Sequence, residues 1–396
     1  MRIRAVMAGG LILGAIGLAA AAAAGAEAAE RTRLRIATAF EPEQIAAAKQ
    51  AIEAAVPEVE VVWERAATGI LTERILDGTE GRPDMAFGLA VTSLLQFEQA
   101  GLLAAYTPKG AERLRTSFRD PAPPYSWSGM DAFLGVICFN AEAAARERLS
   151  RPNFWRDLLN PLLKGRVVMP DPTRSGTGYM LVSGWLQSMG EEPAWAFMDA
   201  LHEQVATYPP SGTAPCAEAA AGRMAAGLSF DMRAATEKGA GAPIDIVVPV
   251  DGTGWDQEGL AIFAGTAHPD LARRVADWGV SREANQLYAQ TYAVVAYPGV
   301  SNPAPDLPAA RRGADDPHRP RLDGEPPRPH RRRVAPTLRR QGGALRGGVV
   351  ASDRSPSRPV RTRRRRGCSR MRPRSTAAAR LQAKFSPLRN TSCERQ

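Results

Sequence analysis

The sequence predicts an α/β protein with two lobes around a central cleft. Between residues 31 and 300, short apolar or alternating segments typical of strands recur, with helix-periodic segments between them. This part holds all seven Trp and all seven Tyr, and it is long enough for two lobes of about 100–150 residues each. A cleft between two such lobes is a common site for a small ligand.

The first part of this region alternates strands with helices. The strands are apolar runs, as in "LRIATAF" and "DMAFGLA", or alternate in polarity, as in "VEVVWERA". The first helix stops at Pro57, and the third opens with polar N-cap candidates. This order implies a parallel sheet covered by helices. The expected elements are strands at 34–40, 59–66 and 84–90, and helices at 41–57, 68–77 and 92–103.

The second part continues the pattern without an evident internal repeat. "AFLGVICFN" and "GRVVMPDP" are apolar enough for strands, and small polar residues open a long helix after them. The expected elements are strands at 132–140 and 165–172, helices at 173–190 and 192–204, a helix followed by a short strand at 216–232, a strand and turn at 242–255, and two helices at 269–291.

The N-terminus has the layout of an export signal. Arg2 and Arg4 precede an uncharged apolar stretch, and small-residue cleavage sites follow at 24–28. We expect residues 1–28 to be a cleaved signal peptide and the mature protein to be periplasmic; a single membrane anchor is the alternative. In an oxidising compartment, Cys138 and Cys216 could pair, but spacing alone cannot show proximity. The favoured expectation is two separately buried thiols.

The C-terminal part, residues 301–396, differs from the rest. It holds 25 Lys+Arg against 7 Asp+Glu, a net charge of +18, so residues 1–300 carry −8 of the whole-chain charge of +10. An acidic folded part argues against a nucleic-acid-binding protein. Few Leu, Ile, Val or Phe occur in this basic part, so we expect a disordered Arg/Pro-rich tail at 311–396.

Two segments carry the signature of an anion site. Ser175, Gly176 and Thr177 lie between an extended segment and a helix, and Ser211 and Thr213 flank a glycine ahead of another helix. Glycines allow close backbone approach, and free N–H groups at a helix start carry partial positive charge. Both clusters are therefore candidates for holding an anionic oxygen group. Thr92, at another helix start, is a third candidate. For all three, the alternative is that the residues only cap a helix.

Acidic and aromatic residues at strand ends are candidates for an ammonium group. Asp231 ends "LSFD", and Trp255 with Asp256 ends "DGTGWD". A carboxylate facing an aromatic ring suits an ammonium through ion pairing and cation–π attraction. Phe40 and Glu41, after the first strand, are similar but weaker candidates. A surface Asp and a core Trp remain the alternative.

Signals of catalysis are poor, so we expect a binding protein without a cofactor or metal and not an enzyme. The four histidines do not cluster, and the sequence contains no HExxH, no GxSxG and no paired-Cys zinc spacing. An exported hydrolase with a dispersed Ser/His/Asp site is the enzymatic alternative.

Several blocks together resemble a known family. "TRSGTGYM", "PSGTAPCAEAAAG", "GLSFDMRAATEKGA", "GTGWDQEGLAI" and "REANQLYAQTYAVVAYPGV" resemble the periplasmic substrate-binding proteins of ABC importers. The most similar branch is that for 2-aminoethylphosphonate, in the family that includes ferric-iron binders. The resemblance covers about residues 31–310. It implies a type II periplasmic-binding fold whose hinge-linked lobes close on one ligand, and a monomer that delivers this ligand to a membrane permease and ATPase.

Carried onto this chain, the resemblance implies specific boundaries and roles. Lobe 1 would comprise 29–133 and 246–310, and lobe 2 would comprise 134–245. The anion would be held by Ser175, Gly176, Thr177, Ser211 and Thr213 with Thr92, and the amine by Asp231, Trp255 or Asp256. Another small anion, a polyamine or ferric iron is the alternative ligand. Iron is the weaker alternative, because the iron-binding relatives typically use two adjacent tyrosines and this sequence has no such pair. Tyr288 and Tyr292 are expected in a helical segment outside the candidate loops.

The sequence departs from this family at its C-terminal end. Family members usually continue beyond "AYPGV" with an amphipathic helical segment, whereas this chain turns Arg/Pro-rich. Our hypothesis is a frameshift near residues 309–312, which translation of the other two frames would test. The alternative is a basic arm that binds nucleic acid or acidic lipids.

Overall fold

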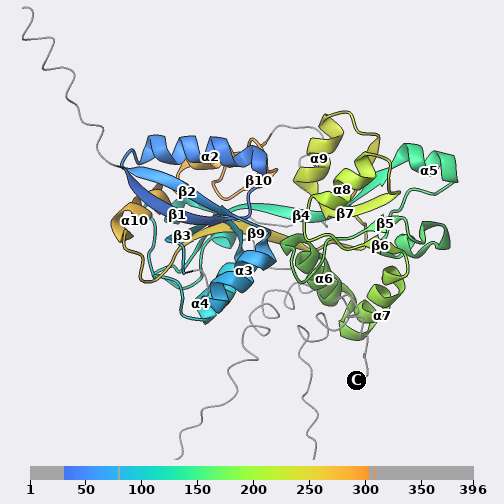
Figure 1. Ribbon diagram of the computed structural model, residues 1–396, viewed down its shortest axis with the longest axis horizontal. Coiled ribbons are helices and arrows are strands. Elements are labelled where there is room, and N and C mark those ends of the chain that lie inside the picture. Colours follow the sequence, from blue (N-terminus) through green and yellow to red (C-terminus); the bar gives the residue numbers. More distant parts are fainter. Residues whose placement is uncertain (1–30, 79–80, 303–306, 308–396) are drawn as a thin grey trace, which may run out of the picture.

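The computed structural model describes residues 31–78, 81–302 and 307. Figure 1 shows two α/β lobes side by side, joined through the long central strand β4 (Ser128–Asn140). The predicted signal peptide at 1–28 and the predicted tail at 311–396 lie outside the described residues. In the part of the chain that is described, no helix has the length and apolar character needed to cross a membrane.

The first lobe is a strand–helix alternation, as predicted. Leu34 and Ile36 of its first strand pack with one set of core residues, whereas Ala37 packs with another, because successive strand residues point to opposite faces. Its elements are β1 (Thr32–Thr38), α2 (Pro42–Ala55), β2 (Val59–Arg65), α3 (Thr68–Asp77), β3 (Met85–Ala90), α4 (Val91–Gln99), β9 (Trp255–Ile262), α10 (Pro269–Gly279), α11 (Arg282–Tyr288) and β10 (Val294–Val295). Helix α2 covers one face of this sheet, and α3 and α4 cover the other (Figure 1).

The second lobe is also built from strands and helices, and its strands are shorter. Strand β5 pairs in parallel with both β6 and β7. Its elements are α5 (Ala141–Glu147), β5 (Val167–Val168), α6 (Gly176–Met189), α7 (Glu191–His202), β6 (Val205–Thr207), α8 (Ala214–Ala220), β7 (Ala226–Phe230), α9 (Asp231–Gly239) and β8 (Ile244–Val247). The predicted helices at 173–190 and 192–204 are confirmed within three residues at each end.

The two lobes share strand β4, which is buried along its whole length. Its first half pairs with β9 and β10, and its second half pairs with β7 and β8. The strand order is β2-β1-β3-β9-β4-β7-β5-β6. The proposed lobe boundaries, with 29–133 and 246–310 in one lobe and 134–245 in the other, stay predictions.

The expectation of a parallel sheet is correct for β1 with β2 and β3 and for β5 with β6 and β7, and it is wrong for β4, which runs antiparallel to β7 and β8. Strand β9 runs antiparallel to both β3 and β4. The sequence reading missed β9 because its first half, Asp256, Gln257 and Glu258, is polar and does not look like a buried strand. All three side chains are nevertheless buried.

A disulfide joins Cys138 to Cys216, so the favoured expectation of two separate thiols is wrong. Cys138 lies on β4 directly opposite Gly227 of β7. A Cβ atom at Gly227 would lie only 1.9 Å from the Pro215 carbonyl oxygen, so this glycine lets α8 pack tightly onto the sheet. That packing brings the two cysteine Cα atoms to 5.3 Å, within the range of a disulfide.

Candidate ligand site

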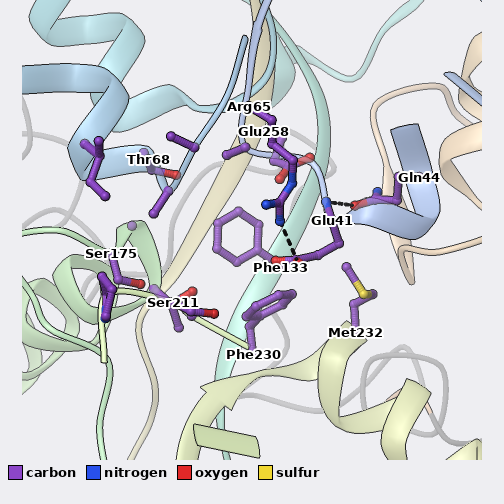
Figure 2. Close-up of a pocket in the computed structure, with 18 of the residues that line it drawn as sticks. Glu41, Gln44, Arg65, Thr68, Phe133, Ser175, Ser211, Phe230, Met232 and Glu258 are labelled. Carbon is purple, nitrogen blue, oxygen red and sulfur yellow. Dashed lines mark hydrogen bonds and ion pairs between the residues drawn. The ribbon is translucent and has the colours of Figure 1, made fainter. Parts of the chain in front are cut away.

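A cavity of about 300 Å³ lies between the lobes. Figure 2 shows Ser175 and Ser211 on one side of it and Glu41, Arg65 and Glu258 on another. Its wall combines small polar, acidic and aromatic side chains with one arginine. The lining residues are Ala39, Glu41, Gln44, Arg65, Ala66, Ala67, Thr68, Ile70, Phe133, Ser175, Gly176, Thr177, Pro210, Ser211, Gly212, Phe230, Met232, Glu258 and Tyr292.

The start of α6 forms one wall of this cavity. Ser175 is its N-cap, and the Ser175 hydroxyl oxygen accepts a hydrogen bond from the Gly178 N–H at 3.4 Å. Gly176 and Thr177 begin the helix, where backbone N–H groups have no partner within the helix. A Cβ at Gly176 would lie 2.9 Å from the Thr68 side chain, so glycine allows the helix to approach the other lobe. Such a helix start is suited to a negatively charged oxygen.

A second loop meets α6 at this wall. A Cβ at Gly212 would lie 2.3 Å from the Thr177 hydroxyl oxygen, so only glycine allows this approach. The Ser229 hydroxyl holds the loop by donating to the Gly212 carbonyl at 2.7 Å. Ser211 lines the cavity, whereas Thr213 does not; its hydroxyl oxygen lies 2.8 Å from that of Ser211. The two predicted anion-binding segments thus meet at one cavity.

The opposite wall is acidic, and of its two carboxyl groups the sequence pointed only to Glu41, as a weaker candidate. The Arg65 guanidinium lies 3.1 Å from a Glu41 carboxylate oxygen and also donates to the Phe40 carbonyl at 2.6 Å. Burial raises the pKa of Glu41 above its ordinary value, although Arg65 opposes this shift. Phe133 and Phe230 add aromatic surface, with ring centroids 5.8 Å apart in an edge-to-face arrangement.

Tyr292 and Glu258 form the buried end of this acidic wall. The Tyr292 hydroxyl donates to a Glu258 carboxylate oxygen at 2.9 Å and accepts from the Gln44 amide at 3.3 Å. The expectation that Tyr292 lies in a helical segment is wrong, because α11 ends at Tyr288; Tyr292 lies outside the two predicted loops, as expected, yet it lines the cavity. Burial is the main cause that raises the Glu258 pKa to about 8, and nearby Glu41 and Asp256 add to it.

Two other predicted residues flank this cavity without lining it. Phe40 is 2% exposed and packs edge-to-face on Trp63 and Phe87. Asp231 is also 2% exposed, and its carboxylate accepts from the Leu134 N–H at 3.2 Å. Burial raises the Asp231 pKa to about 6. The residues next to them in the sequence line the cavity instead. Which residue of a segment faces the cavity depends on the backbone conformation, and the sequence motif did not show it.

The remaining predicted residues line a separate cavity of about 290 Å³. The Thr92 hydroxyl donates to an Asp256 carboxylate oxygen at 2.7 Å, and burial raises the Asp256 pKa to about 6. Trp255 is 41% exposed at this cavity. Thr92 also shares a more open groove of about 600 Å³ with Ser175. The structure therefore does not bring Trp255 or Asp256 together with the Ser211 loop.

The lobes touch each other beside the main cavity. The Gly69 N–H of α3 donates to the Arg174 carbonyl at 3.0 Å. At another point of contact, the Arg233 guanidinium of α9 lies 3.6 Å from a Glu43 carboxylate oxygen of α2. These contacts join the two lobes at two points.

The raised pKa of Glu258 predicts a pH-dependent stability. The folded-state pKa of about 8 exceeds the ordinary value of 4.5, so the folded protein binds this proton more tightly than the unfolded chain does. The resulting stabilisation is complete below about pH 4.5 and is lost as the pH rises through about 8. We expect the free energy of unfolding of the wild type to fall over this window, relative to Glu258→Gln, by on the order of 2–4 kcal/mol.

Urea unfolding at several pH values measures this difference. Glu283→Gln is the matched control, because Glu283 is exposed and its change leaves the buried groups in place. Equal pH slopes for the wild type and Glu258→Gln would contradict a buried, protonated Glu258.

The family model described as "Bacterial extracellular solute-binding protein" matches residues 82–316, more than half of the chain. This chain belongs to that family. An uncharacterized protein of Haemophilus influenzae is 33% identical to this solute-binding protein over 207 residues. The match covers 52% of this chain and 60% of that relative, so the chain spans less than two thirds of its length.

Solved structures show the same two-lobed α/β fold of type II periplasmic binding proteins. The periplasmic binding protein AfuA from Actinobacillus pleuropneumoniae, described with exogenous fructose-6-phosphate bound, has a TM-score of 0.63 and 27% identity. The alignment covers 69% of this solute-binding protein and 86% of AfuA. Iron-bound HitA from Pseudomonas aeruginosa has a TM-score of 0.58 and 18% identity, covering 68% and 88% of the two chains. The predicted fold class is thus confirmed.

Metal ligands do not gather in the described part of this solute-binding protein. Across residues 31–78, 81–302 and 307, no group of three or more His, Cys, Asp or Glu side chains is arranged to hold a metal ion.

Proposed function

We propose that this solute-binding protein captures 2-aminoethylphosphonate in the cavity between its lobes and delivers it to the permease of an ABC importer, from the periplasm. The observation that carries the proposal is the convergence of Ser175, Thr177 and Ser211 with the start of α6 on one cavity. Hydroxyls and free backbone N–H groups suit the oxygens of a phosphonate. A cavity of about 300 Å³ is suited to a small ligand.

The opposite wall supports a zwitterion over a simple anion. Glu41 and Glu258 provide carboxyl groups, and Phe133 and Phe230 provide aromatic faces. These are the groups that attract an ammonium. The amine would therefore lie near these residues and not near Asp231, Trp255 or Asp256, which the sequence reading favoured. A ligand that touches both lobes would favour the closed arrangement by population shift.

A sugar phosphate is the second candidate ligand. AfuA, 27% identical, is described with fructose-6-phosphate bound, and a phosphate group would use the same hydroxyls and helix start. Titration calorimetry of the full chain with 2-aminoethylphosphonate, fructose-6-phosphate, phosphate, ferric citrate and putrescine separates these ligands. We expect the strongest binding for 2-aminoethylphosphonate. Strong binding of ferric citrate or putrescine alone would overturn the proposal.

Thr177→Val is expected to weaken both 2-aminoethylphosphonate and ethylphosphonate roughly tenfold to a hundredfold. A hydrogen bond to a charged group contributes about 1.5–3 kcal/mol, and valine keeps the shape while removing the donor. Calorimetry measures the effect. Thr116→Val is the matched control, because the Thr116 hydroxyl accepts a hydrogen bond from Arg119 and neither residue lines the cavity. Wild-type affinity in Thr177→Val would remove Thr177 from the site.

A further inference from the structure

Asp131 and Glu258 form a buried pair of carboxyl groups behind the cavity. They are direct partners on the antiparallel strands β4 and β9, so their side chains lie on the same face of the sheet. Asp131 is completely buried, and Glu258 is 8% exposed where it lines the cavity. One member of the pair therefore faces the ligand while the other is sealed behind it.

Asp131 has no good partner for a negative charge. Neither of its carboxyl oxygens makes a well-formed hydrogen bond with the described residues, and only the Glu258 backbone favours its ionised form. An unpaired buried carboxylate is very costly. Burial, followed by the neighbouring Glu258 and Asp231, raises the Asp131 pKa well above its ordinary value. Two like charges this close cannot both ionise without compensation, so the pair retains a proton.

The surroundings of the pair supply little positive charge. Among the described lining residues Arg65 is the one cation, and it is already engaged by Glu41 and the Phe40 carbonyl. Arg233 contributes positive charge near Glu41. The other titratable groups around the pair are acids or phenols: Glu41 from the start of α2, Asp256 from β9, Asp231 from α9, Tyr288 from α11 and Tyr292 after it. A cation from outside would therefore be the missing partner.

We propose that the Asp131–Glu258 pair holds one proton in the unliganded protein and releases it when the ammonium group of an aminoalkyl phosphonate binds beside Glu258. The inference rests on the proposed function and adds how the ammonium end is recognised. The ligand nitrogen keeps its three protons, and the proton of the pair leaves to the buffer. A positive charge at the cavity face of Glu258 stabilises the ionised carboxylate and makes this exchange favourable.

Two buried acidic side chains can lie side by side without a neutralising Lys or Arg when they share one proton. A permanently ionised Glu258 beside Asp131 would destabilise the fold, whereas a protonated pair can be buried at low cost. The same proton release makes the site selective for ligands with an ammonium group. A ligand without this group leaves the pair protonated and forms no ion pair with Glu258. The pair would then discriminate between an aminoalkyl phosphonate and an alkyl phosphonate of the same length.

Titration calorimetry in buffers of different ionisation enthalpy counts the protons released on binding. At pH 7 we expect the wild type to release up to one more proton per 2-aminoethylphosphonate than Glu258→Gln does. The phosphonate's own titration contributes equally to both proteins and cancels. Ethylphosphonate, which lacks the ammonium group, should give the same count in both proteins. Equal counts with 2-aminoethylphosphonate, or the same excess with ethylphosphonate, would overturn the inference.

Infrared spectroscopy of the wild-type chain provides a test without a mutation. The carbonyl band of a protonated carboxyl group should be present in the unliganded protein at pH 7 and should weaken when 2-aminoethylphosphonate is added. Absence of the band before addition, or its persistence with bound ligand, would overturn the inference. If the band is present but no phosphonate binds, the proposed function and the proton release are both wrong. The band would still show that a buried carboxyl group is protonated.

Discussion

Gly69→Ala is expected to weaken ligand binding roughly tenfold to a hundredfold without destabilising the fold. A Cβ at Gly69 would lie 2.7 Å from the backbone of Arg174 in the other lobe, so no side-chain rotation can relieve the contact. The lobes would have to separate, and overpacking of this kind costs about 1–3 kcal/mol. Within α3 itself alanine is a better helix former than glycine, by up to about 1 kcal/mol. Binding and stability should therefore change in opposite directions.

Calorimetry with 2-aminoethylphosphonate and urea unfolding without ligand measure these two effects on the same protein. Gly239→Ala is the matched control, because a Cβ at this helical glycine would have open space around it. Unchanged affinity in Gly69→Ala would show that ligand binding does not need the contact between α3 and the Arg174 segment.

Removing the disulfide is expected to destabilise the protein by roughly 4 kcal/mol, the value that chain entropy gives for a crosslink between positions 78 residues apart. The variant is Cys138→Ser with Cys216→Ser in the full chain, and its free energy of unfolding in urea is compared with that of the wild type. Ligand affinity should also fall, because Cys216 lies in α8, directly after the Ser211–Gly212 loop. The crosslink ties this helix, and with it the loop, to strand β4.

The control is Cys368→Ser with Cys393→Ser, which leaves the Cys138–Cys216 bond in place. If both double variants unfold at the same urea concentration, the disulfide contributes nothing to stability. If stability falls without a change in affinity, the disulfide does not position the loop.

The anion side of the site could be predicted from the sequence because its signal is local. Ser175, Gly176 and Ser211 each provide a hydroxyl or a glycine ahead of a helix. Such a segment offers hydrogen-bond donors to an anion whatever the rest of the fold is. The structure adds that the two segments face one cavity. It decides this through the close approach of Gly212 to Thr177, which no spacing in the sequence encodes.

The acidic side could not be predicted in the same way. Glu258 lies in a polar stretch that reads as surface, and only the pairing of β9 with β4 buries it beside Asp131. Asp231 looked like a ligand residue because it ends an apolar strand, yet its carboxylate turns to the backbone N–H of Leu134. Periodicity indicates which segments reach a cleft, but a shift of one residue reverses the side to which a strand residue points.

By itself, the sequence determined the fold class, most of the helices, the absence of catalytic motifs and the two hydroxyl-and-glycine segments. These features depend on periodicity, capping and composition, which act over a few residues. Tertiary structure alone decided the antiparallel join of the lobes, the Cys138–Cys216 bond and the burial of Glu258 against Asp131. Each of these brings together residues from distant parts of the chain, and such proximity follows from the packing of the whole sheet rather than from any local pattern.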